Sequence, residues 1–525
     1  MHHRTLATAL SLLILGAVAA WAQQLRSVQV RTANGVLEGV VSPDGKVRTF
    51  KGIPYAAPPI GPLRWQPPQP APSWTGVRKA VEYAPRAMQG RIYDDMIFHD
   101  PGPSEDCLYL NLWMPEDHPE GKLPVMVWIH GGGFVAGSSS EPRQDAGNLS
   151  KNGVMVVSFN YRLGVFGFLA LPDLTEESEH HASGNYGLLD QVAALRWVKE
   201  NIAAFGGDPD NVTIFGQSAG SSSVSALMAS PLTQGLFQKA IGESGALFSS
   251  TRPPMSLTDA ENSGVRWADS AFGNASVNAL RAMPAQVVLD AALRVPRERF
   301  RPDIDGYFLP TDCRSIYAEG KQRHIPLLAG WNKDEGDFQT FFAFDKPTIR
   351  NYLDHARARF GVRADAFLKV YPAATDSEAK RSARDFEGDR SAGYPTWKWI
   401  ELHLATGRSR VYRYFCDQSL PLPAGAAPGA EPSAPHSAEI EYVFRVLSSR
   451  NLPWRPEDHE VSELLSSYWT NFAKTGNPNG PGLPPWPVYE GRDGYQVMTI
   501  GSKPHAVPDR HRARYEFLDT LGSTW

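Results

Sequence analysis

The sequence predicts an α/β fold, in which a large and mostly parallel central sheet is flanked by helices. Two observations between residues 123 and 220 support this prediction. Apolar, β-branched runs typical of strands covered on both faces alternate with a segment that has apolar residues at helical spacing. That helical segment ends in Gly206 and Gly207 and is followed at once by another strand-like run, which is the order expected of βα units.

The expected elements follow one another along the chain. We expect strands in LPVMVWIHGGGF, GVMVVSFNYR, VTIF, HIPLLAG and RVYRYF, and a helix in GLLDQVAALRWVKENIAAF. Segments of about 251–323 and 338–407 have helical patterns with few strand signals, and we expect them to be helical insertions that form a pocket wall or lid. Residues 419–444 are rich in Pro, Ala and Gly, which is typical of a linker, but they also contain His436.

The composition indicates a globular protein rather than a disordered or fibrous one. The 525 residues are 42% hydrophobic and 21% charged, so the chain can bury a large core. The formal net charge is −4 and the sequence has no basic tract, so we expect no nucleic-acid partner. Three widely spaced cysteines allow at most one disulfide, and without clustered histidines they indicate neither a metal site nor a cofactor: Cys107, Cys313 and Cys416.

The N-terminus has the pattern of an export signal. Residues 1–22 combine a basic start at Arg4, an apolar run over 6–20, and small residues at the end of that run. A membrane-spanning helix needs roughly 20 apolar residues, and this run is shorter. We therefore expect cleavage after Ala22, a mature chain of residues 23–525 that forms one domain, a periplasmic or secreted location, and no stable membrane anchor after cleavage.

A serine between two glycines follows the expected strand VTIF, in GQSAG (216–220). A sharp turn from strand to helix forces its central residue into an unfavourable conformation, and only small residues two positions away let the chains pass. Gly216 and Gly220 meet that requirement around Ser218. The turn would place the N–H of Ala219 at a helix start, where it can stabilise negative charge. The pattern favours a nucleophilic serine, although an ordinary glycine-rich turn has the same composition.

Three successive glycines follow the first of the buried strands, in HGGGF (130–134). Such a run lets the backbone turn sharply and aim several N–H groups at one point, as in an oxyanion hole. Flexible turns also use glycines. The pairing of this loop with a downstream G-x-S-x-G turn is uncommon, however, and it indicates an esterase-like site.

A serine hydroxyl is a poor nucleophile unless a base and an orienting carboxylate assist it. Downstream of Ser218, the acids Asp334, Glu335 and Asp337 lie just past an expected strand, and His436 follows. The order Ser, acid, His is that of sheet hydrolases, and the carboxyl ends of parallel strands are where such sheets gather their sites. Spacing alone does not choose among the three acids.

The sequence resembles the type-B carboxylesterase family, the cholinesterase-like branch of the α/β-hydrolases. The similarity covers roughly residues 36–489 and is carried by motifs that include FKGIPYAAPPIGPLRWQPPQP, SEDCLYLNLWMP, HGGGFVAGS, NYRLGVFGFLA, GQSAG, GWNKDEGDF, PHSAEIEYVF and YWTNFAKTGNPNG. The resemblance implies the α/β-hydrolase fold and the hydrolysis of small-molecule carboxylic esters through an acyl-enzyme.

The resemblance also implies roles for individual residues. It makes Ser218 the nucleophile, Glu335 the acid, with Asp334 as the alternative, and His436 the general base. Ser244 matches a second serine that belongs to a hydrogen-bond network behind the triad, and it fits a plain turn residue equally well. The implied oxyanion donors are three backbone N–H groups, those of Gly132, Gly133 and Ala219.

Three positions differ from the family pattern. Gln217 stands where the family usually has Glu, and Ile97 stands where cholinesterases carry a tryptophan that stacks on a quaternary ammonium. We therefore expect a neutral small to medium ester rather than a choline ester. Ala87 occupies the position of the cysteine that pairs with Cys107 in the family, so we expect Cys107 to be unpaired. Gln217 and Phe338 are candidate substrate-binding residues. Phe338 stands at a position where the family lines its gorge with an aromatic residue.

Other functions fit parts of the same pattern. A lipase, an amidase, or a hydrolase of polyesters or lactones would use the same fold and the same residues, because substrate choice depends on loops and insertions. A non-catalytic binding protein of the cholinesterase-like group typically lacks part of the triad, whereas this sequence has a nucleophile, an acid, a base and an oxyanion loop.

Overall fold

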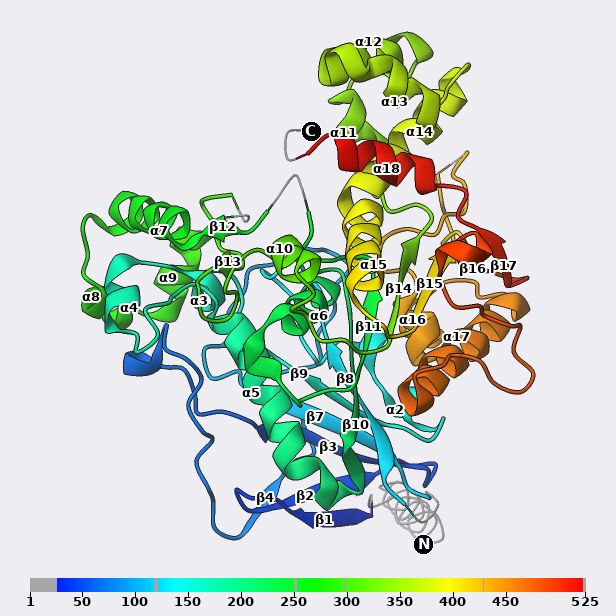
Figure 1. The fold of residues 1–525 in the computed structure, drawn as a ribbon. Helices are drawn as coiled ribbons and strands as arrows, with labels where there is room; N and C mark the ends of the chain where they lie inside the picture. The colour runs from blue at the N-terminus through cyan, green and yellow to red at the C-terminus, as the bar shows by residue number, and fades with distance from the viewer. Residues whose placement is uncertain (1–25, 118–120, 250–252, 297–298, 428, 523–525) are drawn as a thin grey trace, which may run out of the picture.

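The computed structural model describes residues 26–522 except 118–120, 250–252, 297–298 and 428 (Figure 1). The expected export signal, residues 1–22, lies outside the described residues. A mixed sheet of 13 strands forms the centre of the described chain. Its order is β1 (Ser27–Arg31), β2 (Val36–Val41), β3 (Val47–Pro54), β7 (Tyr109–Pro115), β9 (Met155–Phe159), β8 (Leu123–Ile129), β10 (Gly207–Gln217), β11 (Lys239–Glu243), β14 (Leu327–Asn332), β15 (Val411–Cys416), β16 (Gln496–Ile500) and β17 (His505–Pro508), with β4 (Val77–Lys79) paired to β2.

The central strands of this sheet are parallel and the outer ones antiparallel. Neighbouring strands from β9 through β8, β10, β11, β14 and β15 to β16 all run parallel, whereas β1, β2, β3, β7 and β17 pair antiparallel with their neighbours along the sheet. This arrangement confirms the expected α/β fold, and each expected strand between 123 and 415 is present. Because parallel strands end at one edge of the sheet, the loops that follow β8, β10, β14 and β15 meet there.

Helices cover both faces of the sheet. Alternate side chains of β8 join two different cores, one with Val127 and the other with Trp128. On one side lie α5 (Tyr186–Asn201), the expected helix, and α6 (Ala219–Ala229). The other core contains α2, α16 and α17, where the ring of Trp128 lies 4.9 Å from that of Phe444. The bounds of these last helices are Gly147–Ser150, Ile440–Phe444 and Pro456–Thr475.

Helices make up about half of the first expected helical segment, which also contains the paired short strands β12 (Met255–Ser256) and β13 (Asp303–Ile304), and most of the second. The first holds α7 (Leu257–Phe272), α8 (Val277–Ala282), α9 (Ala285–Ala292) and α10 (Cys313–Ala318). The second holds α11 (Phe338–Phe342), α12 (Ile349–Phe360), α13 (Ala364–Val370), α14 (Asp376–Gly388), a π-helical turn (Asp389–Gly393) and α15 (Tyr394–Thr406). In Figure 1, α7 to α9 lie at the left with α4 (Pro172–Glu177), and α12 to α14 lie at the top beside α18 (Arg512–Thr520).

The segment that resembles a linker passes the edge of the sheet. Between β15 and α16 its described residues form no helix or strand longer than an isolated bridge, in which Asp334 pairs with Pro435. The backbone N–H of Asp334 donates to the carbonyl oxygen of Ala434 at 2.9 Å. This pairing fixes the segment beside the end of β14 and so determines where His436 lies.

All three cysteines carry free thiols and are buried: Cys107, Cys313 and Cys416. No disulfide therefore closes a loop of the described chain, and packing and polar contacts hold the fold. Among the helices of the described residues, none combines the length and the apolar character needed to cross a bilayer.

A buried ion pair connects the end of β9 to α5. The guanidinium of Arg162 donates to Asp190 through Nε at 2.8 Å and Nη2 at 2.7 Å, and the backbone N–H of Arg162 donates to the same carboxylate at 3.0 Å. The two side chains are only 3% and 0% exposed. Removing one partner would leave the other charge buried and uncompensated.

We predict that Asp190→Ala lowers the free energy of unfolding by about 3–5 kcal/mol, because Arg162 would remain buried without its partner. Denaturant unfolding measures this change. The matched control is Arg492→Ala, whose side chain is 79% exposed and pairs with Glu490 at the surface; we expect it to change the free energy by less than about 0.5 kcal/mol. Similar small changes in both variants would contradict the prediction.

Candidate active site

Ser218 lies in the strained turn that joins β10 to α6. Its backbone has φ 58° and ψ −120°, a conformation that L-residues rarely adopt and that costs of order 1–3 kcal/mol. A Cβ atom at Gly220 would lie 2.0 Å from the carbonyl oxygen of Ile129, and one at Gly216 would lie 2.7 Å from the backbone of Gly220. Both glycines are therefore required for this turn, as the sequence indicated.

The triple-glycine loop follows β8 directly and turns with positive φ angles at Gly132 (+100°) and Gly133 (+65°). A Cβ atom at Gly132 would lie 2.0 Å from the carbonyl oxygen of Ala136, so this position accepts only glycine. Gly133 and Ala219 line the same cavity as Ser218, whereas Gly132 is not part of its described lining.

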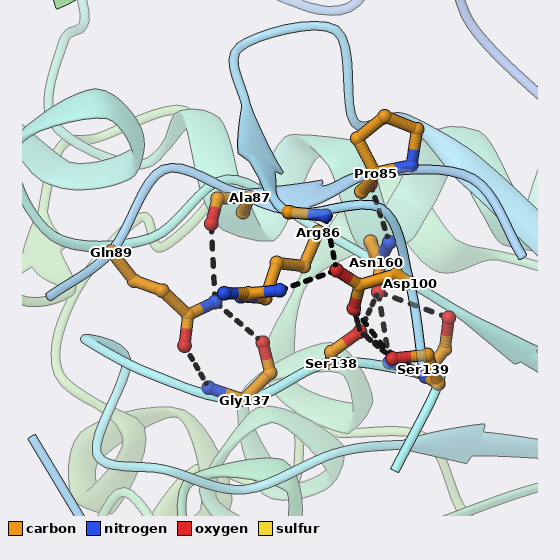
Figure 2. A network of polar contacts seen from close by, with 11 residues as sticks. Pro85, Arg86, Ala87, Gln89, Asp100, Gly137, Ser138, Ser139 and Asn160 are labelled. Carbon is orange, nitrogen blue, oxygen red and sulfur yellow. Dashed lines mark hydrogen bonds and ion pairs between the residues drawn. The ribbon is translucent and has the colours of Figure 1, made fainter. Parts of the chain in front are cut away.

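A network of polar contacts ties this loop to residues 85–100 (Figure 2). The side-chain amide of Gln89 donates to the carbonyl oxygen of Gly137 at 2.8 Å and accepts from the N–H of Gly137 at 2.9 Å. One residue further, the hydroxyl of Ser138 donates to Asp100 at 3.1 Å. The amide of Gln89 thus makes the same pair of hydrogen bonds to the backbone of Gly137 that a neighbouring strand would make. No motif in the sequence pointed to this residue.

Glu335 and His436 meet at the edge of the sheet. The Nδ1 atom of His436 lies 2.6 Å from Oε2 of Glu335, and the other oxygen of Glu335 accepts from the N–H of Asn332 at 2.8 Å. Glu335 is 1% exposed, while the imidazole is 43% exposed because it faces an open cavity. Asp334, the alternative acid, instead accepts a hydrogen bond from the N–H of Ala434 at 2.9 Å.

The surroundings of His436 shift its pKa. The protein atoms packed around the inner part of the ring lower the pKa, but the negative charge of Glu335, its hydrogen bond and the charge of Glu439 together raise it more, so the pKa lies above its usual value. On the other side of the ring, the amide nitrogen of Gln217 lies 3.3 Å from Nε2 of His436. Gln217 therefore contacts the imidazole itself.

Phe338 differs from the expectation that it lines a gorge. It is the first residue of α11, is partly buried against the core, and lies under Lys380, whose Nζ is 4.5 Å from the centre of the ring. It is not part of the cavity lining in the described chain. The ring of Phe338 therefore packs within the helical segment and does not form part of the described cavity wall.

Two buried carboxyl groups, Glu243 and Glu439, lie behind these residues. Glu439 accepts hydrogen bonds from the hydroxyl of Ser244 at 3.3 Å and from the side chain of Asn332 at 2.5 Å. Glu243 accepts from the indole N–H of Trp469 at 2.7 Å. Ser244 is thus part of a polar network rather than only a turn residue. The sequence analysis missed both acids, although a glutamate at the end of an apolar strand (KAIGE) is an unusual feature.

The electrostatic surroundings favour the neutral form of both acids. Burial, and then the charge of Glu335, raises the pKa of Glu439 to about 7. Burial, and then the charge of Glu439, raises the pKa of Glu243. Two adjacent carboxylates cannot both be ionised cheaply in a buried site, so this pair is shifted toward the protonated form.

Ser218, Glu335 and His436 line one cavity of about 440 Å³. This volume lies in the usual range of small-molecule sites. The lining also includes aromatic, small and charged side chains, among them Tyr93, Phe134, Ser222, Leu247, Arg301 and Arg390. Of these, Arg301 and Arg390 come from the first and the second helical segment. No group of His, Cys, Asp and Glu residues in the described part of the chain has the arrangement of a metal site.

Several known proteins are similar to this chain in sequence and in fold. The carboxylesterase family model matches residues 26–518. The chain is 38% identical to fumonisin B1 esterase of Sphingopyxis macrogoltabida over 90% of this chain and 86% of that protein, and 34% identical to cocaine esterase of Homo sapiens over 96% and 93%. A solved structure of PNB esterase superposes with a TM-score of 0.77 at 33% identity, covering 93% of this chain and 99% of that one.

We predict that Glu439→Gln gains stability relative to the parent chain as pH rises from 4.5 to 7. In the unfolded chain the glutamate ionises near 4.5, but in the folded chain it keeps its proton up to about 7, so the parent loses roughly 1.4 kcal/mol per pH unit in this window. Glutamine does not titrate and avoids that loss. Denaturant unfolding at several pH values measures the difference.

The matched control is Glu463→Gln, since the side chain of Glu463 is 60% exposed. We expect its stability difference from the parent to stay nearly constant over the same range. A flat difference for Glu439→Gln as well would show that Glu439 is ionised in the folded protein.

Proposed function

Because the chain belongs to the carboxylesterase family, and is therefore a type-B serine esterase, we propose that Ser218, His436 and Glu335 form its catalytic triad. The observation that carries this proposal is the 2.6 Å contact between His436 and Glu335 at the wall of the cavity that Ser218 also lines. A base held by a carboxylate, on the same cavity as a serine in a strained turn, is the arrangement expected of an activated hydroxyl.

In the proposed reaction, Nε2 of His436 takes the proton of Ser218 while the serine oxygen attacks the ester carbonyl carbon. The imidazolium then protonates the leaving alcohol, and an acyl-enzyme remains on Ser218. Water, deprotonated by the same imidazole, attacks this acyl group; the bond to the Ser218 oxygen breaks, the imidazolium returns its proton to that oxygen, and the acid is released. Glu335 keeps Nδ1 protonated and stabilises the imidazolium during both steps. The first step needs a hydrogen bond between Ser218 and Nε2 of His436, and such bonds often shorten only when substrate is bound.

We assign stabilisation of the tetrahedral oxyanion to the N–H groups of Gly132, Gly133 and Ala219. The positive φ angles of the two glycines allow successive N–H groups to turn toward one point. Ala219 is the first residue of α6, where the helix dipole adds partial positive charge. The pairing of Gln89 with Gly137 supports this role, because it restrains the loop without occupying the cavity.

The proposed substrates are small to medium esters without a positive charge, neutral esters among them. Gln217, in contact with His436, carries no charge, so it offers no electrostatic attraction to a cation. A cavity of about 440 Å³ accommodates a substrate of this size.

We predict that Ser218→Ala lowers kcat by about 10⁶-fold, as in other serine triads. The measurement is release of p-nitrophenol from p-nitrophenyl butyrate, with circular dichroism and thermal unfolding to verify that the variant folds. A folded variant that keeps more than a few per cent of the parental rate would refute the assignment of Ser218.

The same assay compares the proposal with its alternatives. Esters of increasing acyl length, run beside an emulsified triglyceride, separate an esterase from a lipase. Highest activity on short acyl chains, without activation at an oil interface, is expected of the proposed function. Interfacial activation on long chains would instead favour a lipase.

We predict that Glu335→Gln shifts the acid limb of the pH profile of kcat/KM to lower pH. The neutral imidazole is the base, so kcat/KM falls as pH drops through the pKa of His436. Removing the carboxylate charge destabilises the imidazolium and lowers this pKa. The plateau should also fall, by about 10³ to 10⁴-fold, since the orienting carboxylate is lost. An unchanged midpoint would mean that Glu335 does not act on His436.

A further inference from the structure

Cationic side chains outnumber acidic ones among the residues that line the cavity. Four ionisable side chains other than tyrosine line it: Arg301, Glu335, Arg390 and His436. The carboxylate of Glu335 is engaged by His436 and by the N–H of Asn332. Two guanidinium groups thus lie on the wall of this cavity, and the contacts of Arg390 show whether its charge is available to a substrate.

Arg390 reaches the cavity from an unusual backbone element. It lies in the π-helical turn Asp389–Gly393, which interrupts the helical path between α14 and α15. Such turns are rare and frequently mark functional sites. This one presents Arg390, Ser391 and Ala392 to the cavity, while Asp389 points to the protein interior and accepts from the hydroxyl of Tyr371 at 3.0 Å.

The pairing of Arg390 leaves part of its charge uncompensated. Its Nε and Nη2 atoms both contact Oε2 of Glu387, at 2.8 and 2.5 Å. The other oxygen of Glu387 accepts from Nη1 of Arg359 at 2.9 Å. One carboxylate thus serves two guanidinium groups, and the three side chains together carry one net positive charge.

The same contacts hold Arg390 in place. Glu387 is 3% exposed and binds one edge of the guanidinium, whereas Arg390 itself is 21% exposed. The contacts made by Nε and Nη2 leave Nη1 without a hydrogen bond to the described residues. A planar guanidinium that is held on one edge and open on the other is suited to recognise a carboxylate.

We propose that Arg390 binds an ionised carboxylate of the substrate, so that this enzyme prefers esters that carry a second, free carboxylate over uncharged esters of the same shape. This inference rests on the proposed function, because it concerns the cavity that Ser218 lines. Arg301 lines the same cavity. The free carboxylate belongs either to the acid part of the ester or to its alcohol part.

The sequence led to the expectation of a neutral ester, because its local motifs pointed to Gln217 and not to Arg390. Gln217 removes a negative charge at the site, and that observation alone predicts only indifference to cations. Arg390 lies 172 positions beyond Ser218 in the sequence, and both residues line the same cavity. The net electrostatic preference is then for an anion.

The test compares pairs of esters that match in shape and differ in charge. For the acid part, the pair is p-nitrophenyl hydrogen adipate and p-nitrophenyl 6-methylheptanoate, in which an isopropyl group replaces the carboxylate. For the alcohol part, the pair is 4-(butanoyloxy)benzoate and 4-isopropylphenyl butyrate. The measured quantity is the ratio of kcat/KM between the charged and the neutral ester of each pair, corrected for spontaneous hydrolysis.

We predict that Arg390→Gln lowers this ratio by about 10-fold or more for at least one pair, as expected when a hydrogen bond to a charged group is lost. Arg390→Lys should retain part of the preference, because it keeps the charge without the planar fork. In the parent enzyme, the ratio should fall as the salt concentration rises, because salt screens the attraction. The pair that responds identifies the part of the ester that carries the carboxylate.

Arg359→Gln is the matched control, since it removes the other cation bound to Glu387 but does not line the cavity. Its ratio should stay within about twofold of the parental value. An Arg390→Gln ratio equal to that of the parent in both pairs, or an equal fall in Arg359→Gln, would overturn the proposal. If neutral esters are still hydrolysed and Ser218→Ala abolishes that activity, the proposed function stands even when the charge preference fails.

Discussion

The close approach of α6 to the end of β8 is the constraint on which the site depends. Gly220 lies so near the carbonyl oxygen of Ile129 that a Cβ atom there would be 2.0 Å away. This contact brings the turn after β10 against the loop after β8, so that Ser218 and the triple-glycine loop face one cavity. The strained backbone of Ser218 is held in part by its N–H, which donates to the carbonyl oxygen of Glu243 at 2.8 Å.

Asn332 organises the polar side of the same edge. Its backbone N–H donates to Glu335, and its side chain donates to Glu439 and to the carbonyl oxygen of Pro435 at 2.9 Å. One residue at the end of β14 thus orients the carboxylate that contacts His436 and positions the backbone next to His436. Burial raises the pKa of both neighbouring acids, and the strongest attraction on the imidazole comes from Glu335.

The parts of the site that the sequence predicted are those with a local backbone signature. Glycines around Ser218 and in the loop after β8 are required by positive φ angles or close contacts, and such requirements are visible in a short motif. The choice of Glu335 over Asp334 needed the family resemblance, since both follow the same strand. The geometry separates them: Asp334 bonds to the backbone of the segment that carries His436, and Glu335 bonds to the imidazole.

The contacts of Gln89 and Arg390 could not be predicted in this way. Gln89 lies 48 residues from Gly137 and Arg390 lies 172 residues from Ser218; neither sits in a pattern that a helix or strand period would reveal. Their positions follow from how loops and helical segments fold back over the sheet. For the same reason, Phe338 had the expected aromatic character but not the expected place.

The three thiols have a consequence for the conditions under which this enzyme can be made and handled. Burial raises the pKa of Cys107, of Cys313 and of Cys416, so each sulfur stays in its unreactive protonated form. Reducing agents find no bond to cleave in the described chain, and alkylating agents or mild oxidants find no accessible thiolate. The folded state therefore depends on no thiol–disulfide equilibrium among these three cysteines.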